Sequence, residues 1–198
     1  MGATQRRMKL MINDIFYSLQ GEGVNAGMAA VFVRLAGCNR KCAFCDTDTS
    51  VYREMSLDDI IAAADTLTLE SRCRFVVLTG GEPAMQIDSS VIEAFHGLGY
   101  KVAVETNGSL PLPAGIDWLT VSPKGDTVVT HCDELKCIFT GGEPVDDHGI
   151  KARFYCLQPC DVGDAERNRR ITEACVEYVR RHPRWRLSLQ THKLAGFK

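Results

Sequence analysis

The segment AVFVRLAGCNRKCAFC (residues 30–45) joins an apolar, partly β-branched stretch directly to three cysteines, Cys38, Cys42 and Cys45. An almost continuous apolar run is typical of a strand that is covered on both faces, as in parallel sheets flanked by helices. Ligands of such sheets bind at the carboxyl ends of the strands. The three cysteines follow the end of this strand, and we therefore expect them at the functional edge of an α/β fold.

Six more segments have the β-branched, aromatic and apolar content of strands. They are residues 74–79, 100–105, 117–122, 134–140, 153–158 and 185–190, and helical patterns occupy residues 56–70, 88–98 and 165–181. Strands that alternate with helices predict parallel βαβ units. Residues 106–117 and 123–133 are too short and too rich in Pro and Gly for a crossover helix. The sequence therefore predicts a trimmed, partly open parallel (β/α) barrel, with residues 1–198 in one domain.

The predicted strands share a polar carboxyl end. Their last residues are Arg34, Thr79, Glu105, Ser122, Thr140, Gln158 and Gln190. Because the carboxyl ends of parallel strands meet at one edge, these side chains predict a shared polar mouth at which ligands bind.

Composition narrows the class of protein. The chain is 45% hydrophobic and 24% charged with a net charge of −2, which is ordinary for a soluble globular protein and argues against direct nucleic-acid binding. No apolar run approaches the length of a membrane span, and the first residues lack the apolar stretch of a signal peptide. Nine cysteines, an odd number, favour a reducing compartment, so we expect a cytoplasmic protein. The six cysteines outside residues 38–45, a segment called the cluster loop below, are expected to be small buried hydrophobes.

The spacing Cys38-x3-Cys42-x2-Cys45 can hold a 4Fe-4S cluster and leave one iron without a protein ligand. A structural zinc site completed by a distant His or Cys is the alternative that spacing alone leaves open. A redox Cys-x-x-Cys pair would need no third cysteine nearby.

These cysteines, with Phe44 directly before the last of them, resemble the signature of the radical S-adenosylmethionine enzymes. The resemblance implies a cluster whose open iron binds the amino and carboxylate groups of S-adenosylmethionine. The segment TGGEP at 79–83 resembles the part of that family that receives the methionine amino group, here through Gly81. A second TGGEP at 140–144 has different flanks, and we expect it to serve as a turn.

Further stretches resemble one family among these enzymes, the 7-carboxy-7-deazaguanine synthases. They are FYSLQGEG (16–23), VFVRLAGC (31–38), CDTD (45–48), ETNGSLP (105–111), VSPK (121–124) and HPRWRLSLQTHK (182–193). The resemblance implies a carbon–nitrogen lyase of queuosine biosynthesis. It would contract 6-carboxy-5,6,7,8-tetrahydropterin to 7-carboxy-7-deazaguanine with loss of ammonia. Two alternatives remain: another small radical enzyme such as a glycyl-radical activase, and a non-catalytic iron–sulfur or zinc module.

The same resemblance assigns roles to individual residues. It implies substrate contacts at Leu19, Gln20, Gly21, Glu22, Arg34, Thr79 and His192. It implies cofactor contacts at Phe44, Cys45, Asp46, Gly81, Ser122, Pro123, Lys124, Gln158, Pro159, Cys160 and Asp161, with Glu105 holding ribose hydroxyls or the substrate. Taken alone, the segment DTD (46–48) predicts a turn or a helix cap, and only the resemblance makes Thr47 a magnesium ligand.

The resemblance also concerns the C-terminal residues and the molecules with which the protein interacts. Relatives end near a Pro whose carboxylate reaches the substrate, and the matching length after His192 predicts that Lys198 folds back over the site in the same way. A frayed terminus is the alternative. We also expect a reducing electron donor such as flavodoxin or ferredoxin, a homodimer, and no membrane association.

Overall fold

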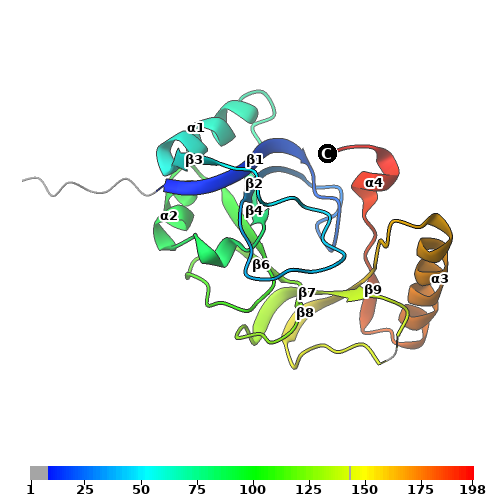
Figure 1. The fold of residues 1–198 in the computed structure, drawn as a ribbon. Helices are drawn as coiled ribbons and strands as arrows, with labels where there is room; N and C mark the ends of the chain where they lie inside the picture. The colour runs from blue at the N-terminus through cyan, green and yellow to red at the C-terminus, as the bar shows by residue number, and fades with distance from the viewer. Residues whose placement is uncertain (1–8, 143) are drawn as a thin grey trace, which may run out of the picture.

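The computed structural model describes residues 9–142 and 144–198, and within these nine strands form one curved sheet (Figure 1). The strands are β1 (Lys9–Leu19), β2 (Ala29–Leu35), β3 (Arg53–Ser56), β4 (Phe75–Gly80), β5 (Lys101–Thr106), β6 (Trp118–Val121), β7 (His131–Phe139), β8 (Lys151–Pro159) and β9 (Trp185–Leu187). Their order is β3-β1-β2-β4-β5-β6-β7-β8-β9, and the two edges do not pair with each other. The predicted α/β class with an open parallel barrel is confirmed.

Seven strands from β2 to β9 pair in parallel, but β1 pairs antiparallel with both β2 and β3. The sequence prediction missed β1 and β3. β3 has four mostly polar residues, and the pairing of β1 with β2 shifts register between Ile12 and Asp14. β3 is a short polar edge strand, and Asn13 and Asp14 interrupt the apolar residues of β1, so neither shows the continuous apolar signature of the central parallel strands. The last predicted strand was too long, because β9 ends at Leu187.

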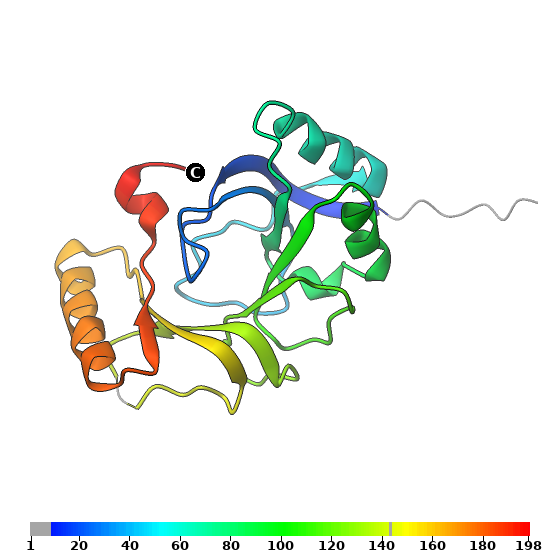
Figure 2. The ribbon, with the colours of Figure 1, turned by 180° about the vertical axis from the view of Figure 1, so that it is seen from behind.

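The predicted helices are confirmed as α1 (Leu57–Leu67), α2 (Ser89–Gly97) and α3 (Ala165–Arg181). Ser56 caps α1 by accepting a hydrogen bond from the Asp59 amide at 3.2 Å, as the capping-box spacing predicted. All three lie on the outer side of the curved sheet (Figure 2). The links from β5 to β6 and from β6 to β7 contain no helix, as their length and composition predicted.

Buried apolar side chains fill the space between the sheet and these helices. Phe95 of α2 packs with Leu35 and Leu78 of the sheet in one cluster, and Cys175 and Tyr178 of α3 pack with Leu157 in another. Of the six cysteines outside the cluster loop, Cys137, Cys156, Cys160 and Cys175 are buried, and Cys73 and Cys132 are half-buried. Burial raises the pKa of the Cys137, Cys156 and Cys175 thiols to about 12, which keeps them protonated and unreactive.

A short C-terminal helix, α4 (Thr191–Ala195), crosses from β9 back toward β1 (Figure 1). The chain end therefore lies beside the N-terminal strand of the sheet. Among the described helices, none has the length and apolar character needed to cross a membrane.

Candidate active site

Two neighbouring cavities open at the carboxyl ends of the strands. The larger has a volume of about 790 Å³ and the smaller about 500 Å³. Both are lined by Glu22, Asp46, Thr47, Thr79, Gly80, Glu105 and Lys193. Six of the seven predicted strand-end residues line the larger cavity, and Arg34 lines the smaller one. The prediction of a shared polar mouth is confirmed, and the mouth is divided into two adjoining compartments.

The cluster loop places Cys38, Cys42 and Cys45 on the wall of the larger cavity. The Cys45 amide donates to the Cys42 carbonyl at 3.1 Å, and the Arg40 amide donates to the Cys38 sulfur at 3.4 Å. Burial raises the pKa of the Cys38 thiol, and the charges of Glu82, Cys42 and Cys45 add to this effect. Three neighbouring thiolates disfavour one another unless a cationic centre is bound among them.

The thiols suit a cluster better than a single ion. Within residues 9–142 and 144–198, no three Cys, His, Asp or Glu side chains converge on a point where one metal ion could be held. A cubane takes each thiolate on a different iron, so its ligands need not converge on one point. Three thiols on one loop, at the wall of a cavity that can admit a further ligand, therefore fit a 4Fe-4S cluster with one open iron.

The first TGGEP segment holds the cluster loop by its backbone. The Gly81 amide donates to the Leu35 carbonyl at 3.0 Å, and the Glu82 amide donates to the Gly37 carbonyl at 2.9 Å. A Cβ added at Gly81 would lie 1.7 Å from the Gly37 oxygen. Gly80 has φ +125°, which favours glycine. The two glycines are therefore required for the close approach of two backbones beside the cysteines.

A buried ionic network lies where the two cavities meet. Lys136 of β7 donates to Glu22 at 2.5 Å, and its ammonium lies 3.9 Å from Glu105. Glu105 also accepts hydrogen bonds from Gln20 and Thr79, both at 2.9 Å. The predicted substrate residues Gln20, Glu22 and Thr79 and the predicted cofactor residue Glu105 thus belong to one network.

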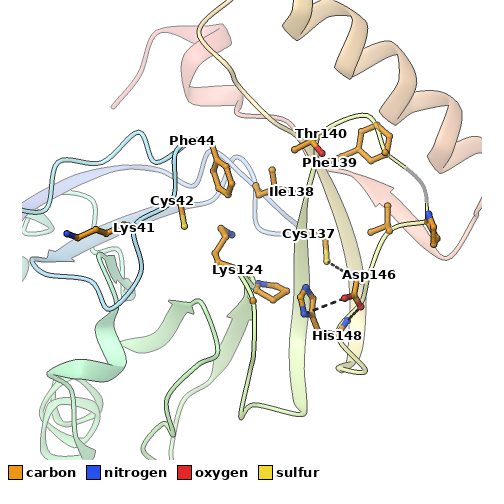
Figure 3. Close-up of a pocket in the computed structure, with 15 residues that line it drawn as sticks. Lys41, Cys42, Phe44, Lys124, Cys137, Ile138, Phe139, Thr140, Asp146 and His148 are labelled. Atoms are coloured by element: carbon orange, nitrogen blue, oxygen red, sulfur yellow. Dashed lines mark hydrogen bonds and ion pairs between the residues drawn. The ribbon is translucent and has the colours of Figure 1, made fainter.

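A third cavity of about 580 Å³ adjoins the larger one and shares Cys42, Phe44, Lys124, Ile138 and Thr140 with it (Figure 3). The Lys124 ammonium lies 5.9 Å from the centre of the Phe44 ring and donates to the Ser122 hydroxyl at 2.5 Å. Burial, together with the charge of Lys136, lowers the pKa of Lys124 to about 8. Pro123 lines this third cavity and not the larger one. Thr140 lines both, while Glu143 of the second TGGEP lies outside the described residues, so the turn prediction for that segment stays a prediction.

The other predicted cofactor residues come together. Phe44, Cys45, Asp46, Gly81, Glu105, Ser122, Lys124, Gln158, Pro159, Cys160 and Asp161 all line the larger cavity. Asp161 accepts a hydrogen bond from Lys193 at 2.8 Å, and Lys193 also pairs with Asp46 at 3.2 Å. These contacts tie the segment after β8 to the cluster loop.

The predicted substrate residues surround the smaller cavity. Leu19, Gln20, Gly21, Glu22, Arg34, Thr79, His192 and Lys198 all line it. Arg34 donates to the Thr47 hydroxyl at 3.1 Å, and its guanidinium lies 5.8 Å from the centre of the Phe16 ring. The ring of His192 packs so closely on Gly21 that a Cβ there would lie 2.2 Å from Nδ1. Arg34 and the stacked Phe16 and Phe32 rings offer a cation beside a flat aromatic wall.

The C-terminal tail closes one side of the smaller cavity. The Ser18 hydroxyl donates to the Lys198 backbone oxygen at 2.5 Å. The Lys198 ammonium pairs with Asp14 and lies 4.6 Å from the centre of the Phe16 ring. The tail is therefore folded back onto β1, and the contact of its carboxylate with a substrate stays a prediction.

Sequence reasoning missed the charged side chains in the interior of the open barrel. Lys136 and Glu134 are buried on β7, and Glu82 is fully buried at the end of β4. The available signal was the pair of opposite charges two residues apart within the apolar strand ELKCIFT (134–140), since such residues share one face of a strand.

The fold and the cysteine loop define the class of protein. The sequence model of the Radical SAM superfamily matches residues 33–131. The 7-carboxy-7-deazaguanine synthase of Bacteroides thetaiotaomicron is 44% identical over 96% of this chain and all of its own length. That of Nitratidesulfovibrio vulgaris is 42% identical over 96% of this chain and 99% of its own length. The crystal structure of QueE from Escherichia coli matches with a TM-score of 0.71 and 27% identity, covering 93% of this chain and 95% of that one.

The chain therefore belongs to the radical S-adenosylmethionine superfamily and, within it, to the 7-carboxy-7-deazaguanine synthase family. Membership in this family implies a 4Fe-4S cluster and S-adenosylmethionine, and the residues of the larger cavity fit both.

The close approach of Gly81 to the Gly37 carbonyl can be tested by adding a Cβ at residue 81. In Gly81→Ala the new Cβ must displace the Gly37 carbonyl and shift the start of the cluster loop, because no flexible side chain is present to yield. We expect iron content after reconstitution and S-adenosylmethionine binding to fall sharply, with a loss of stability of about 1–3 kcal/mol. Iron assay, equilibrium dialysis and thermal unfolding measure the three effects.

Gly97→Ala is the matched control, because a Cβ at this helical position meets nothing within 4 Å. It should leave iron content and cofactor binding unchanged. Wild-type iron content and binding in Gly81→Ala would show that the close approach is not needed.

Proposed function

We propose that this protein converts 6-carboxy-5,6,7,8-tetrahydropterin to 7-carboxy-7-deazaguanine by radical ring contraction with loss of ammonia, as a lyase of queuosine biosynthesis. The main observation that supports this proposal is the pair of adjoining cavities that share Glu22 and Glu105. One cavity lies beside three thiols, and the other lies beside Arg34 and an aromatic wall. This arrangement can hold a planar carboxylated heterocycle next to a cluster-bound cofactor. The family supports the same reaction.

Cys38, Cys42 and Cys45 would hold the cluster, and the larger cavity would hold S-adenosylmethionine. When bound, cluster and cofactor supply the radical that removes hydrogen from the pterin. The chain's own residues orient the two ligands and exclude water from the space between them. No side chain in the shared wall is required as a strong general base in this proposal.

The smaller cavity supplies groups that match the pterin. Arg34 presents a fork of N–H donors, which suits the carboxylate of the substrate. Glu22 and Glu105 present carboxylate oxygens, which suit the N–H donors of the reduced rings. His192 and Lys198 cover the cavity from the C-terminal side.

Magnesium is part of the same proposal. Thr47 lies on the wall shared by both cavities, beside Asp46, and oxygen donors of this kind are the ligands that Mg²⁺ prefers. Most remaining ligands would come from water and the substrate carboxylate.

The cellular setting proposed here is a cytoplasmic homodimer of single-domain subunits, reduced by a small donor such as flavodoxin or ferredoxin. One continuous sheet through the described residues supports the single domain. The exposed Cys38 and Cys45 support access of a donor to the cluster.

The deciding experiment is an anaerobic assay. Reconstituted and reduced protein, S-adenosylmethionine and 6-carboxytetrahydropterin should give 7-carboxy-7-deazaguanine, detected by mass analysis. A triple variant with Ala at Cys38, Cys42 and Cys45 should hold no cluster and form no product. A glycyl-radical activase would cleave the cofactor without converting the pterin, and a non-catalytic module would do neither.

Thr47 and Arg34 contact each other, but the proposal gives them different ligands. Variants of the two residues therefore test magnesium binding and substrate-carboxylate binding separately. Thr47→Ala removes one hydroxyl ligand, and we expect the magnesium needed for half-maximal turnover to rise several-fold. Arg34→Lys keeps the charge but loses the fork, and we expect about a tenfold rise in KM for the pterin with little change in the magnesium dependence. A magnesium titration of Thr47→Ala that overlays the wild type would refute the metal role.

The role of the terminal carboxylate can be tested by lengthening the chain. A Gly-Ser extension after Lys198 moves the terminal carboxylate away from the smaller cavity and leaves every side chain in place. We expect unchanged iron content and slow cofactor cleavage, with about tenfold weaker pterin binding, because a charge-assisted contact is lost. Replacing the Lys198 side chain alone, as Lys198→Met, is the control for its pairing with Asp14. Wild-type affinity in the extended protein would mean that the carboxylate has no part in binding.

A further inference from the structure

Lys136 is a lysine buried in the interior of the barrel for which no role has been assigned above. Its side chain is only 6% exposed, and it points from β7 to the junction of the two cavities. Its ammonium contacts Glu22 at 2.5 Å and approaches Glu105 at 3.9 Å. Burying a lysine is costly unless it is paired, so this position needs an explanation beyond packing.

Glu22 is held from two sides. Lys136 donates to one carboxylate oxygen, and the amides of Gln158 and Gln190 donate to the other at 3.1 and 2.9 Å. Three donors on one carboxylate fix its rotation as well as its charge. Glu22 is also one of the seven residues that line both cavities.

We propose that Lys136 is a positioning residue for the pterin: by pairing with Glu22, it keeps that carboxylate charged and aimed at the junction, where it accepts hydrogen bonds from the N–H groups of the ring. This inference rests on the proposed function and extends it to a residue that would not touch the substrate itself. The chemical consequence is a preference for a ring that is rich in N–H donors.

The charges around Glu22 support this role. Lys136 and Glu134 face it from β7, Glu105 from β5 and Lys124 from the loop after β6, while Asp46 reaches it through Gln190. Burial alone would raise the pKa of Glu22. The charge of Lys136 and the hydrogen bonds from Lys136 and both Gln amides outweigh burial and lower this pKa to about 2.

Removing Lys136 reverses this balance. Burial then acts without its largest opponent, and the pKa of Glu22 rises from its lowered value, with only the two Gln amides still opposing burial. A carboxyl with a raised pKa becomes protonated as the pH falls, so the variant loses its acceptor at low pH while the wild type keeps it. Pterin binding by the variant should therefore weaken more than binding by the wild type as the pH falls.

The test is a four-protein cycle of reconstituted holoenzymes: wild type, Lys136→Met, Glu22→Gln and the double variant. Equilibrium dialysis of 6-carboxytetrahydropterin under argon gives the affinity at about pH 6 and about pH 8. Iron content and thermal unfolding are recorded for each protein. Lys151→Met, at the exposed start of β8, is the control for loss of a lysine and should bind as the wild type does.

We expect Lys136→Met to bind the pterin about tenfold more weakly at about pH 8 and more weakly still at about pH 6. The double variant should bind no worse than Glu22→Gln, because Lys136 acts through Glu22 and the two losses are then not additive. Additive losses, or an unchanged affinity and pH dependence in Lys136→Met, would overturn the proposal.

Should Lys136→Met not fold, the comparison of Glu22→Gln with the double variant still decides, since the double variant leaves no unpaired charge at this contact. Equal affinities support the proposal, and a further loss in the double variant contradicts it. A wild type that neither binds nor converts the pterin would instead refute the proposed function, so the two failures are distinguishable.

Discussion

The geometry of the site depends on Glu82, a carboxylate with no exposed surface that joins three strand ends. Its backbone amide donates to Gly37 in the cluster loop, while its side chain accepts from the Thr106 hydroxyl at 2.6 Å and the Asn107 amide at 2.7 Å after β5. Asn107 in turn donates to Asn39 at 3.0 Å. A buried carboxylate is tolerated only when its oxygens are satisfied, so the ends of β2, β4 and β5 must keep this arrangement together. The cysteines and the cofactor segment are placed by that requirement.

Central strands and the cysteine loop could be predicted from the sequence because their signals are local. An apolar run marks a strand covered on both faces, and three thiols at fixed spacing mark a cluster loop. The four-residue β3 escaped prediction because its polar residues resemble those of a loop, and β1 escaped because Asn13 and Asp14 interrupt its apolar residues. The pairing of Lys136 with Glu22 joins residues 114 positions apart, and such a contact has no local pattern. The site residues named by resemblance, except Pro123, line one of the two adjoining cavities, whereas the buried charges of Lys136 and Glu134 became apparent only in the structure.

The interior of this open barrel is unusually polar for a protein core. Glu22, Glu105, Glu134 and Lys136 lie together where a closed barrel would hold layers of branched aliphatic side chains. Such a network contributes little to stability compared with well-packed apolar residues. A role in ligand binding accounts for these buried charges. Fixed, charged acceptors in a buried site bind N–H donors without first having to reorganise. The aliphatic clusters on the outer face of the sheet then supply the stability that the interior lacks.

An open sheet leaves one side of this polar interior to be covered, and the C-terminal tail covers it with weak contacts. None of the side chains of α4 is buried, and the ion pair between Lys198 and Asp14 is largely exposed. Exposed ion pairs contribute about 1 kcal/mol or less, so these contacts hold the tail closed by a small margin. Its start is attached more firmly: the Thr191 amide and hydroxyl both donate to the Gly21 carbonyl at 2.8 Å, and Lys193 pairs with Asp161 at 2.8 Å and with Asp46 at 3.2 Å. The tail is thus anchored to the wall of the site at its start and held onto β1 at its end by weaker, more exposed contacts.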